Sequence, residues 1–527
     1  MDHNSQKSNT AHVELVQSDT NVDDEASIST QPRTSTWKAV IGNPKIIALC
    51  LFANIGGMMY GFDNLVLSLS LSMPAFAQQY GTLQPSGSYI ISASWQSLWN
   101  ALAQIATAVG AACAGPLQDR FGRRISFIVA AVISMAGVAV IYTSSNPSTY
   151  LAGKIVNGLS LGMILTTGQT YISEIAPPSF RGIALSLFTF SMNLGYMIAA
   201  SLALSRTSIL DKSSYQVLFA VEWCWPALIL LFVFFVPESP YYLVMKDQTD
   251  KARQQLEKLC GKKEDVEPEL QRIVNTYEEE KRLHEGSEAS GFLDCFRGTD
   301  WRRTRIILYC NALPQVIGST FMANGPYFLV QAGMSPFRVN MMIELGIGFG
   351  IAGSLITIYL MNVCGFRRLI MAGVAVSTTL YTVIGIAGCF PSSSTALWIV
   401  GIFLQLTWWT FGPTIGPAMA IAGEVSSMRL RAKSLALGFT FNYTFSTIMN
   451  VVVPYMFNQD QGNWGGKIGW VFAGMGIIAL ALVFLEIPET KKRSFPELDS
   501  LFLEKVPTRS FKTARTVITH EEQKVVD

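Results

Sequence analysis

Two ionisable residues lie deep inside apolar stretches of this 527-residue chain, where a charge is difficult to accommodate. Asp63 is the only acidic residue between Lys45 and Asp119, and Lys154 stands well inside a later apolar stretch. A charged side chain at the centre of a membrane-length helix costs roughly 2.5–3.5 kcal/mol on insertion scales, so it usually marks a functional site. Apolar surroundings favour a neutral carboxylic acid, whereas a nearby cation favours the carboxylate. Asp63 is therefore a candidate to bind and release a proton.

A second set of charges stands at the ends of apolar stretches, where opposite charges could pair and separate. Glu174 precedes Arg181 by seven residues, and Glu424 precedes Arg431 by the same distance. We interpret the set as a gate at the inner face of a membrane; the alternative is that these charges only anchor helix ends among lipid headgroups. The gate residues are Asp119, Arg120, Arg123, Glu174, Arg181, Glu238, Arg367, Glu424, Arg431 and Glu489.

The elements that must position these residues are membrane-spanning helices. Half of the residues are hydrophobic (50%) and only 14% are charged, and uncharged apolar runs of about 20 residues recur along the chain. Because lipid cannot satisfy free backbone groups, such runs must be helical. Twelve are predicted, at 46–71, 93–116, 125–143, 150–172, 183–205, 215–236, 305–330, 339–361, 369–389, 396–421, 434–457 and 467–487.

The loops between these spans indicate the orientation of the chain. Arginine and lysine are concentrated in alternate loops, such as "DRFGRR" at 119–124, and are scarce in the loops on the other side. The positive-inside rule then places both termini in the cytoplasm. The net charge of +2 says little about partners, since it averages over the two sides of the membrane.

Markers at a nearly constant offset divide the chain into two similar halves. Glu174 and Glu424 are 250 residues apart, "PESP" and "PETK" begin 251 apart at Pro237 and Pro488, and two loop glycines are 243 apart. Duplicated halves around a central site are typical of alternating-access transporters.

The repeat also suggests a division of the chain into domains. We expect a disordered N-terminus (1–40), a first six-helix bundle (41–237), a cytoplasmic loop with amphipathic helices (238–304), a second bundle (305–490) and a cytoplasmic tail (491–527).

These motifs resemble those of the major facilitator superfamily. "GPLQDRFGRR" is similar to its G-x-x-x-D-R-x-G-R-R loop, and "PESP" with "PETK" resembles the signature of the sugar porter family. Within that family, "WPALILLFVFFVPESPYYLV", "FLDCFRGTDWRRTRI" and "PYFLVQAG" resemble the fungal α-glucoside (maltose-type):proton symporters. The resemblance implies an all-α membrane protein, with 12 transmembrane helices in two pseudo-symmetric six-helix bundles and short intracellular helices.

The resemblance also implies roles for single residues. Lys154 occupies the place of a family arginine that partners the first-span aspartate in proton-coupled members, which makes Asp63 and Lys154 the proton-coupling pair. The alternative is a fixed packing pair in a facilitator that moves no protons. Matching positions, together with nearby polar and aromatic residues, give the predicted substrate-binding residues: Thr189, Gln315, Thr320, Asn324, Tyr327, Trp408 and Asn442.

Several positions depart from the family pattern, and they concern the substrate. Pro314 and Thr320 replace a glutamine and an asparagine, and Gly416 stands in place of a tryptophan. A sugar site needs convergent amides and hydroxyls with an aromatic surface. Losing a tryptophan enlarges the pocket, which suits a disaccharide, a glycoside or a different ligand.

We therefore expect proton-coupled uptake of a sugar, either an α-glucoside, a disaccharide or a hexose, by a monomer in the plasma membrane. One alternative is a facilitator or exporter of a polyol, an organic acid or a secondary metabolite; another is a sugar sensor that transports nothing. No residue constellation points to an enzyme, a cofactor, a metal site or nucleic-acid binding, since four histidines and scattered cysteines offer no catalytic grouping. The expected partners are a small-molecule substrate, protons and the lipid bilayer.

Overall fold

The computed structural model describes most of the chain between residues 44 and 511. The described ranges are 44–83, 89–176, 178–207, 209–260, 266–286, 292–391, 393–426, 430–458, 460–491, 493 and 495–511. The predicted disordered N-terminus (1–40) and the end of the predicted tail lie outside the described residues.

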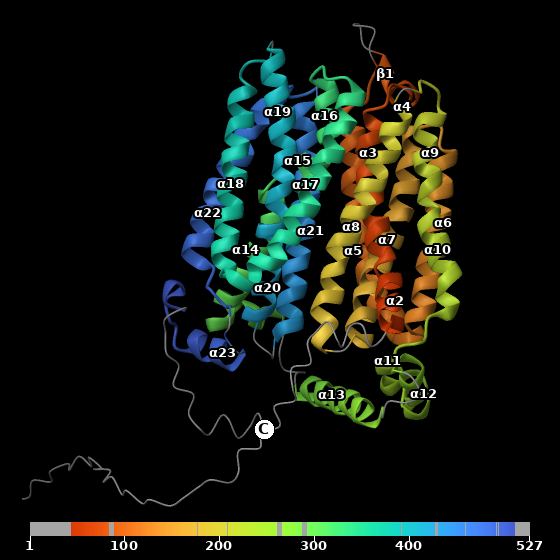
Figure 1. The fold of residues 1–527 in the computed structure, drawn as a ribbon, viewed down its shortest axis with the longest axis vertical. Helices are drawn as coiled ribbons and strands as arrows, with labels where there is room; N and C mark the ends of the chain where they lie inside the picture. The colour runs from red at the N-terminus through yellow and green to blue at the C-terminus, as the bar shows by residue number, and fades with distance from the viewer. Residues whose placement is uncertain are drawn as a thin grey trace, which may run out of the picture.

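The described chain folds into two bundles of long helices that stand side by side (Figure 1). The first bundle contains α2 (Pro44–Ala53) with α3 (Ile55–Leu71), α5 (Ala93–Phe121), α6 (Arg123–Thr143), α7 (Pro147–Ile175), α8 (Pro178–Arg206), and α9 (Ser213–Glu222) with α10 (Cys224–Phe232). The second contains α14 (Gly298–Val316) with α15 (Ser319–Ala323) and α16 (Gly325–Gln331), α17 (Pro336–Val363), α18 (Phe366–Ala387), α19 (Ser394–Leu406) with α20 (Phe411–Val425), α21 (Arg431–Phe457) and α22 (Gly469–Glu486).

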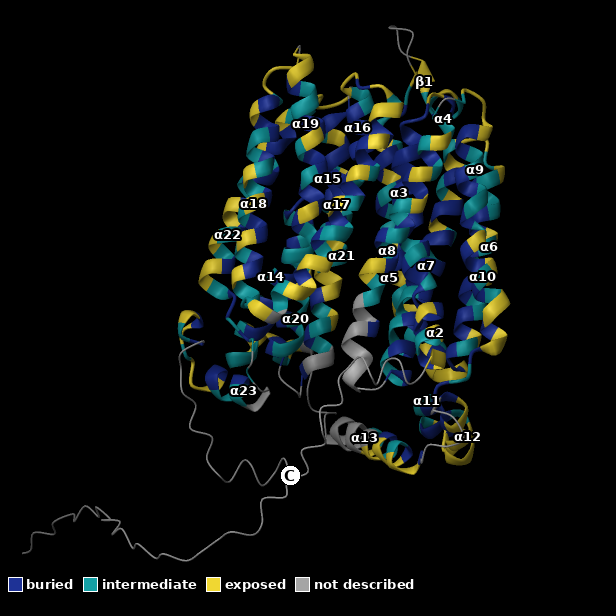
Figure 2. Ribbon diagram, in the orientation of Figure 1, coloured by how far each residue is buried: buried dark blue, intermediate teal, exposed yellow. Residues whose placement is uncertain are grey.

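These helices account for the twelve predicted spans. Within the described residues, ten segments are long and apolar enough to cross a membrane. The other two spans are α7 and α21, which carry amides and hydroxyls along their length but pack within the bundles. Large apolar side chains are exposed on the outside of the bundles, among them Phe235 (81% exposed) and Ile478 (63%), as expected for a surface in contact with lipid (Figure 2). The predicted fold class is confirmed.

Short elements cover the two ends of the bundles. One end carries α4 (Pro74–Tyr80) and the hairpin of β1 (Thr82–Leu83) and β2 (Tyr89–Ile90); we call it the hairpin end. The other end carries α11 (Pro240–Met245), α12 (Thr249–Cys260), α13 (Glu267–Gly286) and α23 (Phe495–Leu503) (Figure 1). We call it the basic end, because Arg123, Arg303 and Arg367 lie there.

The amphipathic helices expected between the bundles are present. Ala252, Leu256 and Leu270 are buried against one another and against residues of α11, so α11 to α13 share a small apolar core. The sequence predicts two helices in this region, and the structure adds the short α11, whose Ser239 cap accepts a hydrogen bond from the Tyr242 N–H.

Four of the twelve spans consist of more than one helix. Asn54 separates α2 from α3, and Trp223 separates α9 from α10. The span at 305–330 breaks after α14, because Gly318 adopts a left-handed conformation (φ +82°) between Pro314 and Pro326. The span at 396–421 contains a 3₁₀ turn, Thr407–Thr410, between α19 and α20. Breaks in membrane helices free backbone groups and are typical of positions that line a transport site.

The helix that carries Lys154 is held close to α5 by glycine. A Cβ atom on Gly158 would lie 2.6 Å from the carbonyl oxygen of Ala103. Glycine thus lets α5 and α7 approach backbone to backbone, so this residue serves tight packing.

Candidate functional site

Asp63 and Lys154 form an ion pair in the core of the first bundle. Lys154 Nζ donates to both carboxylate oxygens of Asp63, at 2.8 and 2.9 Å, and the two residues are only 4–7% exposed. Asn157 Nδ2 donates to Asp63 Oδ1 at 2.8 Å, and Ser134 Oγ donates to Asn157 Oδ1 at 2.9 Å. Glu222, also buried, is close enough to interact electrostatically with both charges. The carboxylate therefore has two direct donors and is shielded from solvent.

The local sequence explains why two side chains of α7, Lys154 and Asn157, both donate to the carboxylate of Asp63. Lys154 and Asn157 are three residues apart, so they project from the same face of the helix. The sequence analysis missed Asn157, although its spacing from Lys154 was a usable signal. A neutral Asp63 would keep these neighbours but lose the ionic part of the interaction.

Three of the predicted substrate-binding residues meet at the break that follows α14. Thr320 Oγ1 and Ser319 Oγ donate to Gln315 Oε1 at 2.8 and 3.0 Å, and Asn324 Nδ2 donates to the carbonyl oxygen of Thr320 at 2.9 Å. All three predicted residues are buried in the second bundle. The break at Gly318 thus brings together groups that the sequence places on a regular helix.

The remaining predicted substrate-binding residues lie apart from this group. Tyr327 accepts a hydrogen bond from Gln331 at the hairpin end. Trp408 packs against Tyr196 of α8, with ring centroids 5.5 Å apart. Asn442 Nδ2 donates to the carbonyl oxygen of Asn311 at 2.8 Å, and the Thr189 side chain is exposed.

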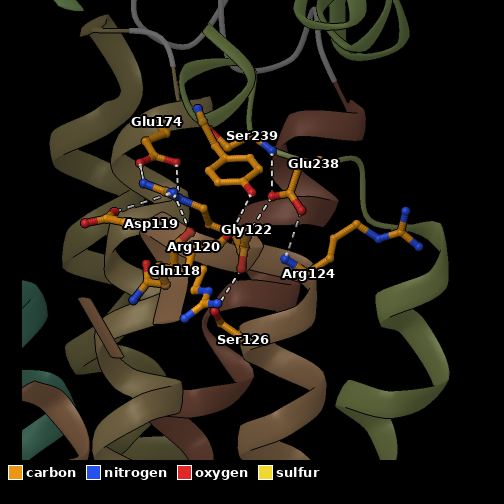
Figure 3. Close-up of polar contacts among 11 residues, drawn as sticks. Gln118, Asp119, Arg120, Gly122, Arg124, Ser126, Glu174, Glu238 and Ser239 are labelled. Carbon is orange, nitrogen blue, oxygen red and sulfur yellow. Dashed lines mark hydrogen bonds and ion pairs between the residues drawn. The ribbon is translucent and has the colours of Figure 1, made fainter. Parts of the chain in front are cut away.

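Four of the first-half gate residues, Asp119, Arg123, Glu174 and Glu238, make a compact cluster at the basic end (Figure 3). Arg123 binds Glu174 of α7 through Nε at 2.9 Å and Nη2 at 2.5 Å, and both side chains are at most 9% exposed. The carboxylate of Glu238 accepts the backbone N–H of Arg123 at 2.8 Å, at the start of α6. Asp119 lies 4.0 Å from Arg123 but is 64% exposed, so it adds little to this pair.

Arg120 contributes its backbone to the same cluster. Tyr242 on α11 donates its hydroxyl to the carbonyl oxygen of Arg120 at 3.2 Å. Burial and the negative charge of Glu238 raise the pKa of Tyr242, which keeps this hydroxyl protonated as a donor. The contact joins α11 to the end of α5.

The second-half gate residues repeat only part of this arrangement. Glu489 accepts the backbone N–H of Phe366 at the start of α18, at 2.9 Å, as Glu238 does in the first half. Arg367 Nη2 donates to the carbonyl oxygen of Phe484 at 2.5 Å. Glu424 lies near the end of α20. Arg181 and Arg431 belong to α8 and α21, but their side chains lie outside the described residues.

Hydrogen bonds join the two bundles at the hairpin end. The backbone N–H of Ala93, in the first turn of α5, donates to Asp460 Oδ2 at 3.1 Å. Ser97 Oγ donates to the carbonyl oxygen of Val451 at 3.0 Å, and Asn458 Nδ2 to that of Ile91 at 3.0 Å. Ser201 also donates to Glu344, at 2.5 Å, between α8 and α17. These contacts hold the bundles together at that end.

Comparison with known proteins agrees with this architecture. The family model described as sugar (and other) transporter matches residues 49–502. An MFS transporter of Aspergillus fumigatus, fmqE, is 29% identical, and the alignment covers 97% of this chain and 98% of that protein. The general alpha-glucoside permease of Saccharomyces cerevisiae is 28% identical, with 94% of this chain and 81% of the permease covered.

Solved structures show the same fold. The inward open conformation of the xylose transporter XylE from E. coli has a TM-score of 0.69 at 20% identity, and the match covers 86% of this chain and 99% of XylE. The two six-helix bundles thus have the same fold as XylE. Since the family model spans nearly all of the described helices, the chain belongs to the sugar (and other) transporter family.

Proposed function

We propose that this protein couples the uptake of a neutral sugar, of the α-glucoside or hexose type, to protons moving down their gradient. Membership of the sugar (and other) transporter family and similarity to an alpha-glucoside permease support a sugar as cargo. The observation that carries the coupling is the buried Asp63–Lys154 pair, since a facilitator needs no ionisable group at this depth.

The pair gives the protein two states with different charge. When Asp63 is ionised, Lys154 and Asn157 hold its carboxylate and tie α3 to α7. A proton on Asp63 removes the charge attraction, which frees α3 to move relative to α7. Lysine is a compact cation on a flexible stem, so it separates from the carboxylate more easily than a bidentate arginine would.

Alternating access follows from the way the two bundles meet. The hydrogen bonds between the described parts of the two bundles lie at the hairpin end, so the substrate would reach the centre from the basic end in this conformation. The described gate residues at the basic end contact groups of their own half, as Arg123 contacts Glu174, and would approach those of the other half when that end closes. Gln315, Thr320 and Asn324 would hydrogen-bond the sugar.

We place the basic end in the cytoplasm, with both termini on that side, because the arginine-rich loops lie there. The domain limits expected from the sequence, 41–237 and 305–490 for the bundles and 238–304 for the connecting loop, serve as the working division of the chain. The proposed site of action is the plasma membrane, and the proposed transporting unit is the monomer.

Uptake of labelled maltose and labelled glucose in a transport-deficient yeast host, with and without a protonophore, tests this proposal. We expect accumulation of at least one of the two sugars above the external concentration, abolished by the protonophore. Uptake that only equilibrates, with or without the protonophore, would contradict proton coupling. Normal surface expression without uptake of either sugar would contradict a sugar as cargo.

A second candidate keeps the scaffold and changes the cargo to a polyol, an organic acid or a secondary metabolite. It is favoured by the small residue Gly416, where an added Cβ would make only ordinary van der Waals contact, with the Sδ of Met361 at 3.8 Å. Competition with labelled maltose uptake by sorbitol, quinate and aromatic glycosides separates the two. Inhibition by sugars alone would reject this candidate.

A further inference from the structure

A polar cavity lies directly beside the Asp63–Lys154 pair, away from the substrate-binding residues that the sequence predicts. Its volume is about 40 Å³, and its lining contains none of those seven residues. Helices α3, α5 and α7 of the first bundle and α21 of the second form its wall. We call it the amide cavity after four of its lining residues: Asn64, Asn100, Gln104 and Asn450.

The amide side chains present hydrogen-bonding groups that the protein itself does not use. Asn100 donates Nδ2 to the carbonyl oxygen of Gln96, and Asn450 donates to that of Ser446, each at 3.0 Å. These bonds fix the two amides and leave their Oδ1 atoms without a donor among the described residues. Gln104 makes no hydrogen bond to any described residue. Such groups are satisfied only by water or by a ligand that carries hydroxyls.

The ion pair supplies two more groups at the same place. Lys154 donates two of its three N–H groups to Asp63, which leaves the third N–H for another acceptor. Among the described residues, Asp63 Oδ2 accepts a hydrogen bond from Lys154 alone. Ala103 also lines the cavity and is only partly buried, so it offers apolar surface there. A carbon carrying a hydroxyl group fits this combination of polar and apolar surface.

The volume limits what the cavity can hold. A water molecule needs roughly 10–15 Å³ of such space, so about three water-sized groups fit. Three such groups are fewer than the heavy atoms of a sugar ring, so this space does not hold an entire sugar in this conformation. Its occupant is therefore one short arm of a ligand that is bound mainly elsewhere.

We propose that the amide cavity is a subsite for the hydroxymethyl arm of a hexose or glucoside, a proposal that rests on the sugar transport proposed above. Asn450 is the lining residue from the second bundle, and the adjacent Val451 carbonyl accepts from Ser97 of α5. An arm held here would touch both bundles and the cation that holds Asp63. Substrate recognition and proton binding would then share one wall.

The test compares two sugars that differ only in this arm, since xylose is glucose without its hydroxymethyl group. Binding of glucose and xylose to the purified full-length protein in nanodiscs is measured for wild type, Gln104→Leu and Asn450→Ala. We expect either substitution to weaken glucose binding about 3- to 10-fold, the equivalent of one neutral hydrogen bond, and to leave xylose binding unchanged. Gln315→Ala, outside the cavity, is the matched control and should weaken both sugars alike.

Two kinds of result would reject the proposed subsite. Unchanged glucose binding in both variants, or an equal loss for both sugars, would mean that the cavity holds water only, and the subsite would be rejected while sugar transport stands. Wild-type protein that binds neither glucose, xylose nor maltose would reject the subsite together with the proposed function. Two variants on different helices, each checked for monodisperse elution, guard against a loss caused by misfolding.

Discussion

The two halves of the chain have the same arrangement of helices, but the polar residues buried inside them differ in kind. At the basic end, Glu238 and Glu489 accept the first N–H of α6 and α18 at 2.8 and 2.9 Å. Inside the bundles the resemblance ends, because the first half buries the Asp63–Lys154 ion pair and the second half buries the hydrogen-bonded group around Gln315. The duplicated fold thus carries a buried ion pair in one half and a neutral hydrogen-bonded group in the other.

The gate shows the same difference on a smaller scale. The first half places Arg123 at the start of α6, where its guanidinium binds Glu174. The second half has Phe366 at the equivalent place, and its backbone N–H donates to Glu489. An apolar side chain thus stands where the first half has the guanidinium of Arg123, so we expect the two gates to respond unequally to mutation.

The largest expected effect comes from breaking the buried pair. Lys154→Ala would leave Asp63 buried without its cation, at an expected cost of about 3–5 kcal/mol in the free energy of unfolding. The double variant Asp63→Asn, Lys154→Met should recover most of that loss. Thermal unfolding in detergent measures both, with Gln315→Ala as the second-half comparison. Equal destabilisation by Lys154→Ala and the double variant would contradict the ion pair.

A smaller effect is expected at the gate. Arg123→Leu removes charged hydrogen bonds to the buried Glu174 and should cost about 1.5–3 kcal/mol. Phe366→Leu keeps an apolar side chain at the matching position and should cost less than about 1.5 kcal/mol. The two melting temperatures, measured side by side, test the inequality. A larger shift for Phe366→Leu would show that the charge pair is not what stabilises this end.

The contact that joins the halves at the hairpin end should have an effect of about 1 kcal/mol. Asp460→Ala removes the acceptor of the Ala93 N–H and the negative charge near the start of α5. Hydrogen–deuterium exchange of the peptide that contains Ala93 should become about fivefold faster, while a peptide from α18 serves as the unchanged reference. Unaltered exchange would mean that this contact does not help to close the hairpin end.

The smallest loss of stability is expected from removing the charge of Glu238 or Glu489, and it should be equal in the two halves. Glu238→Gln and Glu489→Gln keep an acceptor oxygen but remove the charge beside a helix N-terminus, worth about 0.3–1 kcal/mol each. The two variants should lower the melting temperature by similar amounts. A clear difference between the two melting temperatures would show that Glu238 and Glu489 do not stabilise their helices equally, although their distances to the helix N–H groups are similar.

The sequence predicts the spans well because their signals are local. Apolar runs of membrane length and the repeated Glu174 and Glu424 markers lead directly to two bundles of six helices. The breaks at Gly318 and at Thr407–Thr410 escape this kind of reasoning, because both segments remain apolar and only the backbone changes. Prolines near Gly318 were visible but do not by themselves specify a break.

The candidate site is less predictable, since it depends on contacts between distant segments. Asp63 stands out in the sequence because it is a lone charge, yet its donor Asn157 is one of several amides within a span. Asn100 and Asn450 become neighbours only when α5 meets α21 across the two halves. Asp460 likewise reaches Ala93 from 367 positions along the chain. A local sequence pattern cannot predict contacts between residues that lie so far apart in the chain.

The central claim is that Asp63 carries the proton that drives sugar uptake. The most direct measurement is maltose-induced proton movement in proteoliposomes that contain the full-length protein, compared between wild type and Asp63→Asn. We expect wild type to take up protons with maltose. Asp63→Asn should show no proton uptake but should still exchange labelled for unlabelled maltose across the membrane. Maltose-driven proton uptake by Asp63→Asn at the wild-type rate would contradict the account.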